Sequence, residues 1–167
     1  DYTKETFKKR WPNFKQIQNQ LKAIDTTNWS IEHQVDWMLV WAEMNGYDFN
    51  HNILKPWVRD PAFYTAIWMH RSDVPAHEGP TNHGITEVWK YTFPLSVKER
   101  LQFINDLKVI PPLNSQAKQN LTGNAKDLWI TGIRDIRNQS EVLTNLKTKA
   151  ENKDDAEIVS VIDTAIA

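Results

Sequence analysis

The chain has 167 residues, of which 40% are apolar and 25% are charged, and its formal net charge is −1. These values are ordinary for a globular domain with a hydrophobic core, and the balanced charge argues against a nucleic-acid partner. The absence of cysteine excludes disulfides, thiolate catalysis and zinc sites built on sulfur. No apolar run approaches the roughly 20 residues that cross a bilayer, so no transmembrane segment is predicted.

Apolar residues recur at spacings of three and four along most of the chain, and this pattern predicts an all-α fold. A first helix is expected over residues 3–24, where Pro12 would either kink it or start a new helix. A second helix is expected over residues 31–55, with Ser30 as its N-cap. Because apolar side chains occupy two sides of this second helix, we expect it to be buried between neighbouring helices.

The middle of the chain contains a short predicted helix and a long predicted loop. Asp60 followed by Pro61 is typical of a helix start, and the helix would extend through Trp68. Residues 71–94 contain several prolines and glycines and are expected to form a loop, with a short helical piece near residues 85–91. A loop of this length in a compact domain is often functional.

The C-terminal half contains further helix signals. Ser96 and Glu99 form a capping-box pattern, which predicts a helix that ends before Pro111. Pro111 is in turn suited to start the next helix. Asn124 is then expected to cap a long helix over residues 125–150.

The last segment begins with acidic residues suited to a helix N-terminus, and its apolar pattern is still running at residue 167. We interpret this as a chain cut within its last helix, so that residues 1–167 form a single helical N-terminal segment of a longer protein. In total, about six to eight helices are expected in an irregular multi-helix array with a long loop at 71–94. The eight tryptophans lie at helical spacings, which favours packing in the core over a role as a ligand platform.

The pair His77 and Glu78, followed by His83, has the composition of a zinc-binding motif. In a His-Glu-x-x-His helix, however, the two histidines are four residues apart, which places both rings on one face. Here the histidines are six residues apart, and Gly79 and Pro80 would interrupt a helix. We therefore predict no metal site and no catalytic residue in this chain, and we interpret the segment as a polar loop.

The run VDWMLVWAEMNGYDFNHNILKPWVRDPAFYT occupies residues 35–65. It contains a D-x-x-x-x-x-A-E helix at 36–43, an aromatic stretch with Trp57, and the hexapeptide RDPAFY at 59–64. These elements, in this order, resemble a bacterial family catalogued as domain of unknown function 885. The segments SDVPAHEGP, WKYTFPLS and IPPLNSQAKQNLTGNAKDLWITGI are also similar to that family, so the resemblance runs from about residue 20 to the end.

The resemblance implies a longer, mostly helical bacterial protein that is similar to zinc metallopeptidases and is exported to the cell envelope, often as a lipoprotein. The His-Glu-x-x-His motif of such proteins lies in their later half and has no counterpart here. Zinc is therefore expected in the full-length protein, and no cofactor is expected in this chain. The expected partners are the remainder of its own polypeptide and a peptide substrate.

Two functional hypotheses follow. In the first, the chain is the N-terminal helical part of a metallopeptidase-like protein, is not catalytic alone, and contributes one wall of the substrate cleft. The substrate-binding candidates are Arg59, Tyr64, Arg71, His77 and Glu78, although residues 59–64 are also suited to capping and packing. In the second, the chain is an independent helical module that binds a peptide or a sugar through its tryptophans and the 71–94 loop. A purely structural scaffold is a third interpretation.

Overall fold

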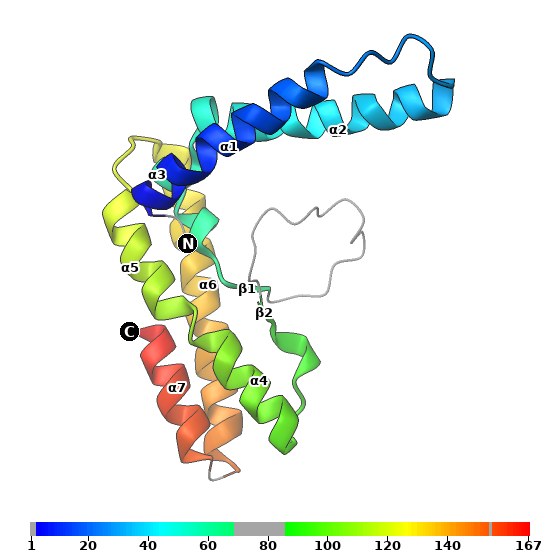
Figure 1. Ribbon diagram of the computed structural model, residues 1–167. Coiled ribbons are helices and arrows are strands. Elements are labelled where there is room, and N and C mark those ends of the chain that lie inside the picture. Colours follow the sequence, from blue (N-terminus) through cyan, green and yellow to red (C-terminus); the bar gives the residue numbers. More distant parts are fainter. Residues whose placement is uncertain (1–2, 69–85, 154) are drawn as a thin grey trace. The chain divides into compact units, whose positions relative to one another are not determined.

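The computed structural model describes residues 3–68, 86–153 and 155–167 (Figure 1). Helices dominate these residues, which confirms the predicted all-α class. The chain divides into two compact units, Asp1–Pro56 and Trp57–Ala167, and each is described by itself below. No described helix has the length and apolar character needed to cross a membrane.

The first unit is a helical hairpin formed by α1 (Lys4–Lys22) and α2 (Ile31–Phe49), which run side by side and are joined by residues 23–30 (Figure 1). The helices are antiparallel, because residues that lie later in α1 pair with residues that lie earlier in α2, down to Leu21 and Trp37. The Lys15 ammonium lies 2.7 Å from the Asp48 carboxylate, and the Gln18 amide donates to the Asn45 side chain at 3.2 Å. Gln18 is the only fully buried residue among residues 3–56.

Helix α1 continues through Pro12, so of the two expected alternatives, a kink or a new helix start, the new start does not occur. A proline inside a helix removes one backbone hydrogen bond and costs roughly 3 kcal/mol. Aromatic contacts on both sides of Pro12 offset this cost. The Trp11 ring stacks on His51 with centroids 4.0 Å apart, and Phe14 packs on Tyr47 at 4.8 Å.

Helix α2 starts as predicted, since the Ser30 hydroxyl accepts a hydrogen bond from the His33 amide. The α-helix ends at Phe49 and is followed directly by a π-helical turn, Asn50–Leu54. Lys55 then takes a left-handed conformation with φ of 47°. The prediction that α2 is buried between neighbours is wrong, because none of its residues is buried. Within the hairpin, α1 covers only one side of it.

The second unit contains the remaining elements. They are α3 (Pro56–Arg59, whose first residue belongs to the hairpin unit), the 3₁₀ helix Pro61–Tyr64, strands β1 (Ile67–Trp68) and β2 (Thr86–Glu87), the 3₁₀ helix Val88–Lys90, α4 (Val97–Leu107), α5 (Ile110–Asn120), α6 (Lys126–Glu151) and α7 (Ala156–Ile166). Helix α6 packs against α7 and against the Pro61–Tyr64 turn, while α4 and α5 also contact α7 (Figure 1). The core lies between these helices, and its largest fully buried aliphatic and aromatic side chains are Tyr64, Phe103, Ile67, Leu107, Ile110, Leu143, Ile158 and Ile162.

Local helix signals in this unit are partly confirmed. Asp60 caps the start of the expected helix by accepting from the Ala62 amide, although this helix is a 3₁₀ turn that ends at Tyr64. Ser96 and Glu99 form the expected capping box. Asn124 is not the cap of the long helix, because Ala125 occupies that position without a side-chain hydrogen bond. Trp68 is not helical either: with Ile67 it forms β1.

The two short strands were not predicted, because two residues are too few for an alternating pattern. β1 pairs with β2 in parallel, with Ile67 opposite Thr86 and Trp68 opposite Glu87. Residues 86–94 of the predicted loop therefore contain a strand and a 3₁₀ turn, and residues 71–85 lie outside the described residues.

Gly132 permits the close packing of α6 on the Pro61–Tyr64 turn. A Cβ atom added at Gly132 would lie 2.7 Å from the Ala62 nitrogen and 2.9 Å from Cδ of Pro61. No side chain larger than hydrogen fits this approach without a shift of the turn.

Candidate binding site in the helical hairpin

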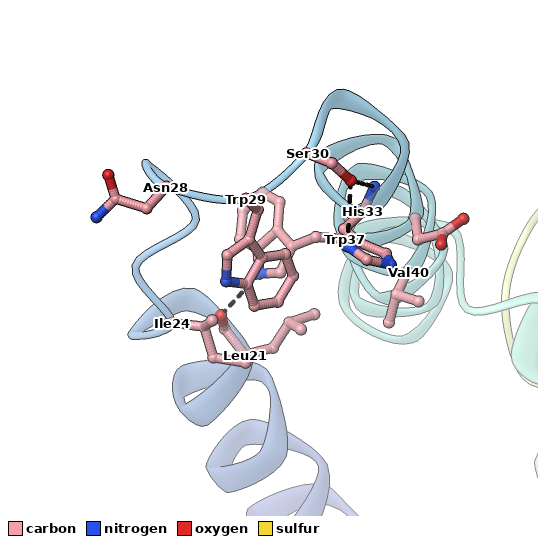
Figure 2. A pocket seen from close by; sticks show the side chains of 9 residues that line it. Leu21, Ile24, Asn28, Trp29, Ser30, His33, Trp37 and Val40 are labelled. Atoms are coloured by element: carbon pink, nitrogen blue, oxygen red, sulfur yellow. Dashed lines mark hydrogen bonds between the residues drawn. The ribbon is translucent and has the colours of Figure 1, made fainter.

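A pocket of about 580 Å³ opens at the end of the hairpin where residues 23–30 connect the two helices (Figure 2). Its walls come from the last turn of α1, the connection and the first half of α2. Nine residues line it: Leu21, Ile24, Asn28, Trp29, Ser30, His33, Asp36, Trp37 and Val40.

Hydrogen bonds at the start of α2 fix the aromatic walls of this pocket. The Trp37 indole donates to the Leu21 carbonyl at 3.0 Å, which joins the two helices at this end (Figure 2). Ser30 caps α2, and its hydroxyl lies 3.1 Å from Nδ1 of His33. The Trp29 ring meets the His33 ring edge-on and is exposed to solvent.

A second hollow of about 530 Å³ continues along the same two helices. It is lined by Phe14, Leu39, Val40, Glu43, Met44 and Tyr47. Because Val40 lines both hollows, they are adjacent, and we refer to them together as the hairpin groove. The floor of the groove is apolar, with aliphatic and aromatic side chains from both helices.

Asp36 and Glu43 are the only acidic side chains that line the hairpin groove, and no lysine or arginine lines it. They are seven residues apart on α2, which places them on one face, about 10.5 Å apart along the helix axis. Within the part of the chain that the structure describes, neither carboxylate forms an ion pair. By contrast, Asp48 is tied to Lys15, whose hydrogen bond holds the pKa of that carboxyl below its usual value.

The opposite end of the hairpin is closed by aromatic rings. His51 stacks on Trp11 and also contacts Phe7, at 5.5 Å, and Tyr47, at 6.2 Å. Burial among these rings lowers the pKa of His51; Asp48 opposes the shift and Lys55 adds to it. This end of the hairpin is therefore packed, whereas the groove is open.

Of the five substrate-binding candidates from the sequence, Arg59 and Tyr64 lie within the described residues. Tyr64 is 1% exposed, and its hydroxyl donates to the Trp57 carbonyl at 2.8 Å and accepts from the Asn120 amide at 3.0 Å. Arg59 is half-buried at the end of α3, and its Cγ lies beside Gly123. These positions favour packing roles for both side chains.

The other three candidates, Arg71, His77 and Glu78, lie outside the described residues. Across residues 3–68, 86–153 and 155–167, no three His, Asp or Glu side chains lie close enough together to hold a metal ion.

The tryptophans do not form the core that their spacing predicted. All eight lie within the described residues, none of them is fully buried, and Trp29 is exposed. Sequence reasoning identified the apolar stripes of α2 but not the groove, because a stripe does not show whether a neighbour covers it. The composition of residues 31–54 could have indicated the groove, because this segment combines many apolar residues with carboxylates and contains no lysine or arginine.

The fold and the groove together define an all-α protein with an open, acidic-rimmed apolar site on a two-helix hairpin. No protein-family model, no curated protein and no solved structure matches this chain. The resemblance to the domain of unknown function therefore stays a prediction.

Proposed function

We propose that the chain is a non-catalytic helical module that binds a helical peptide segment in the hairpin groove. The observation that carries this proposal is the open apolar surface of α2 beside α1. Leu39, Val40 and Tyr47 line the groove, and all three are exposed. Covering a half-exposed side chain of this size contributes about 1 kcal/mol.

A third helix is the shape that fits such a surface. Two antiparallel helices enclose little between them, and the buried interior of this hairpin is limited to Gln18. A helix that lies along the seam completes a three-helix core and places its apolar side chains, three and four residues apart, into the groove.

A peptide fits the groove better than a sugar does. Sugar sites combine an aromatic platform with many polar groups, because each hydroxyl needs a partner. The polar groups of the second hollow are the carboxylate of Glu43 and the hydroxyl of Tyr47, among six lining residues. A mainly apolar floor of this kind favours the apolar face of a helix.

The family resemblance adds a biological setting to this proposal. In that setting, the peptide is either a segment of the same longer polypeptide or a substrate, and the chain is a helical part of a metallopeptidase-like protein of the bacterial cell envelope. The purified chain is then expected to contain no stoichiometric zinc and to hydrolyse no peptide. Elemental analysis that found one zinc per chain would contradict this assignment.

Binding is tested by titrating the full chain with a neutral amphipathic peptide of about 15 residues, carrying leucines on one face and glutamines elsewhere, and following tryptophan fluorescence. We expect Val40→Gln to weaken binding about tenfold, since it places an amide on the groove floor. Val35→Gln is the matched control: Val35 lies on the same helix, is 47% exposed against 51% for Val40, and does not line the groove. Absence of binding, or equal weakening by both substitutions, would contradict the proposal.

A further inference from the structure

We propose that the hairpin groove selects basic helical ligands, and that Asp36 and Glu43 bind two basic side chains placed two turns apart on the ligand. This inference rests on the proposed function and adds the chemical class of the ligand. The charge of the groove, the spacing of its carboxylates and their lack of internal ion-pair partners support it.

The charge of the groove has one sign. Asp36 lines the first hollow and Glu43 the second, and no lysine or arginine lines either one. The whole segment 31–54 contains no basic residue other than histidine; its acidic residues are Glu32, Asp36, Glu43 and Asp48. A ligand that carries carboxylates would therefore meet like charges along the groove, whereas a basic ligand would meet opposite charges.

The spacing of the two carboxylates matches a helix. Asp36 and Glu43 are separated by seven residues, or about 10.5 Å along the axis of α2. On a ligand helix that lies nearly parallel or antiparallel to α2, basic residues at positions i and i+7 have the same separation. The side chains between them, at i+3 and i+4, then face the apolar floor at Val40.

Both carboxylates are available to a ligand. They are exposed and have no ion-pair partner within residues 3–68, 86–153 and 155–167, so binding a basic group breaks no internal salt bridge there. A lysine or arginine can lay its methylene stem on the apolar floor while its head group reaches a carboxylate at the rim. At the Asp36 end, the exposed Trp29 ring offers a further surface that attracts a cation.

A second copy of the chain is a weaker candidate for the occupant. Helix α1 does carry lysines seven residues apart, at 8, 15 and 22. However, its apolar side chains already face its own α2, since Trp11 stacks on His51 and Phe14 packs on Tyr47. A separate basic helix therefore fits the groove better.

The test compares three peptides that share the leucine face of the neutral peptide. They differ at two positions beside that face, seven residues apart, where the first peptide has lysine, the second glutamine and the third glutamate. With the full chain, we expect the lysine peptide to bind about tenfold more tightly than the glutamate peptide, and the difference to shrink as salt is added. Asp36→Asn combined with Glu43→Gln should remove the difference, and Asp36→Lys combined with Glu43→Lys should reverse it. Glu32→Gln is the control, because Glu32 is an exposed acidic residue of α2 that does not line the groove.

The outcomes separate this inference from the proposed function. Equal affinity for all three peptides would overturn the charge selection while leaving peptide binding in place. Failure of every peptide to bind would overturn both. Sedimentation equilibrium is the remaining check: a dimer that Asp36→Lys and Glu43→Lys dissociate would identify a second copy as the occupant and overturn the inference.

Discussion

The side-chain amide of Asn120 donates a hydrogen bond of 3.0 Å to the hydroxyl of Tyr64, and both residues are buried. The two residues are 56 positions apart, so this bond joins the end of α5 to the turn that precedes β1. The same hydroxyl donates to the Trp57 carbonyl at 2.8 Å. Tyr64 thus connects three separate segments of the second unit.

Tyr64→Phe is expected to destabilise the chain by about 1–2 kcal/mol, because it removes two buried hydrogen bonds and leaves the ring in place. The free energy of unfolding, measured by urea denaturation, checks this value. Tyr47→Phe serves as the control, because Tyr47 is exposed on the hairpin. Equal stabilities for both variants and the original chain would show that the Tyr64 hydroxyl contributes nothing.

Two glycines in helices are expected to respond to alanine in opposite directions. Gly46 lies in α2, where an added Cβ meets nothing within 4 Å, so Gly46→Ala should stabilise the chain by about 0.5–1 kcal/mol. Gly132 lies in α6, where an added Cβ would be 2.7 Å from the backbone nitrogen of Ala62, so Gly132→Ala should destabilise it. Thermal unfolding of the two variants side by side measures both signs; a higher melting temperature for Gly132→Ala would contradict the close packing.

Gln139 is expected to be a stabilising residue of the second unit. Its side-chain oxygen accepts from the backbone amides of Ala66, at 2.7 Å, and Ile67, at 3.2 Å, in a buried environment. Gln139→Met keeps the length of the side chain but removes the acceptor, and we expect a loss of about 1–3 kcal/mol. Urea denaturation measures this loss, with the exposed Gln20→Met as control. Wild-type stability in Gln139→Met would argue that water replaces the lost acceptor.

His51 should make the stability of the hairpin depend on pH. Burial lowers its pKa below the ordinary value of 6.5, against the opposing charge of Asp48 and with the help of Lys55. The folded chain therefore binds fewer protons at this position than the unfolded chain does between the two pKa values. The contribution of His51 to stability is therefore fully present above pH 6.5. It is lost as the pH decreases from 6.5 through the lower pKa of the folded chain.

This pH dependence is measured by urea denaturation at pH 7.5 and at lower pH values down to the folded pKa of His51, which NMR titration of the ring gives directly. His51→Phe keeps a ring against Trp11 and cannot be protonated, so we expect this variant to lack the loss between those pH values. A loss of the same size in both proteins would assign it to other groups.

Several helix caps were predicted correctly from the sequence, whereas contacts between residues far apart in the chain were not. Ser30, Asp60 and Ser96 act on amides two or three residues away, so their capping roles follow from short patterns. The sequence left open whether Pro12 kinks its helix or starts a new one, because the ring contacts on both sides of Pro12 come from α2 and the turn after it. The partner of Gln139 is more than seventy residues away, and no local pattern indicates it.

The same distinction applies to the candidate site. Periodicity showed that α2 is apolar on two sides, and it was natural to assume a neighbour for each side. The structure shows one neighbour in the hairpin, α1, and leaves Val40 and its surroundings open. Among the sequence-based candidates at 59–64, Tyr64 instead serves the fold, since its hydroxyl is hydrogen-bonded to Trp57 and Asn120.

The amide pair of Gln18 and Asn45 in the hairpin bears on how fast a ligand would associate. The Gln18 side chain is buried and Asn45 is exposed, so sliding of the two helices would leave the Gln18 amide without its partner, and the bond favours one alignment. A ligand of the proposed kind would then meet a preformed surface, and no slow rearrangement would have to precede docking. We therefore expect association rates near those of ordinary rigid partners. Differences in affinity between ligands should lie mainly in the dissociation rate of the complex.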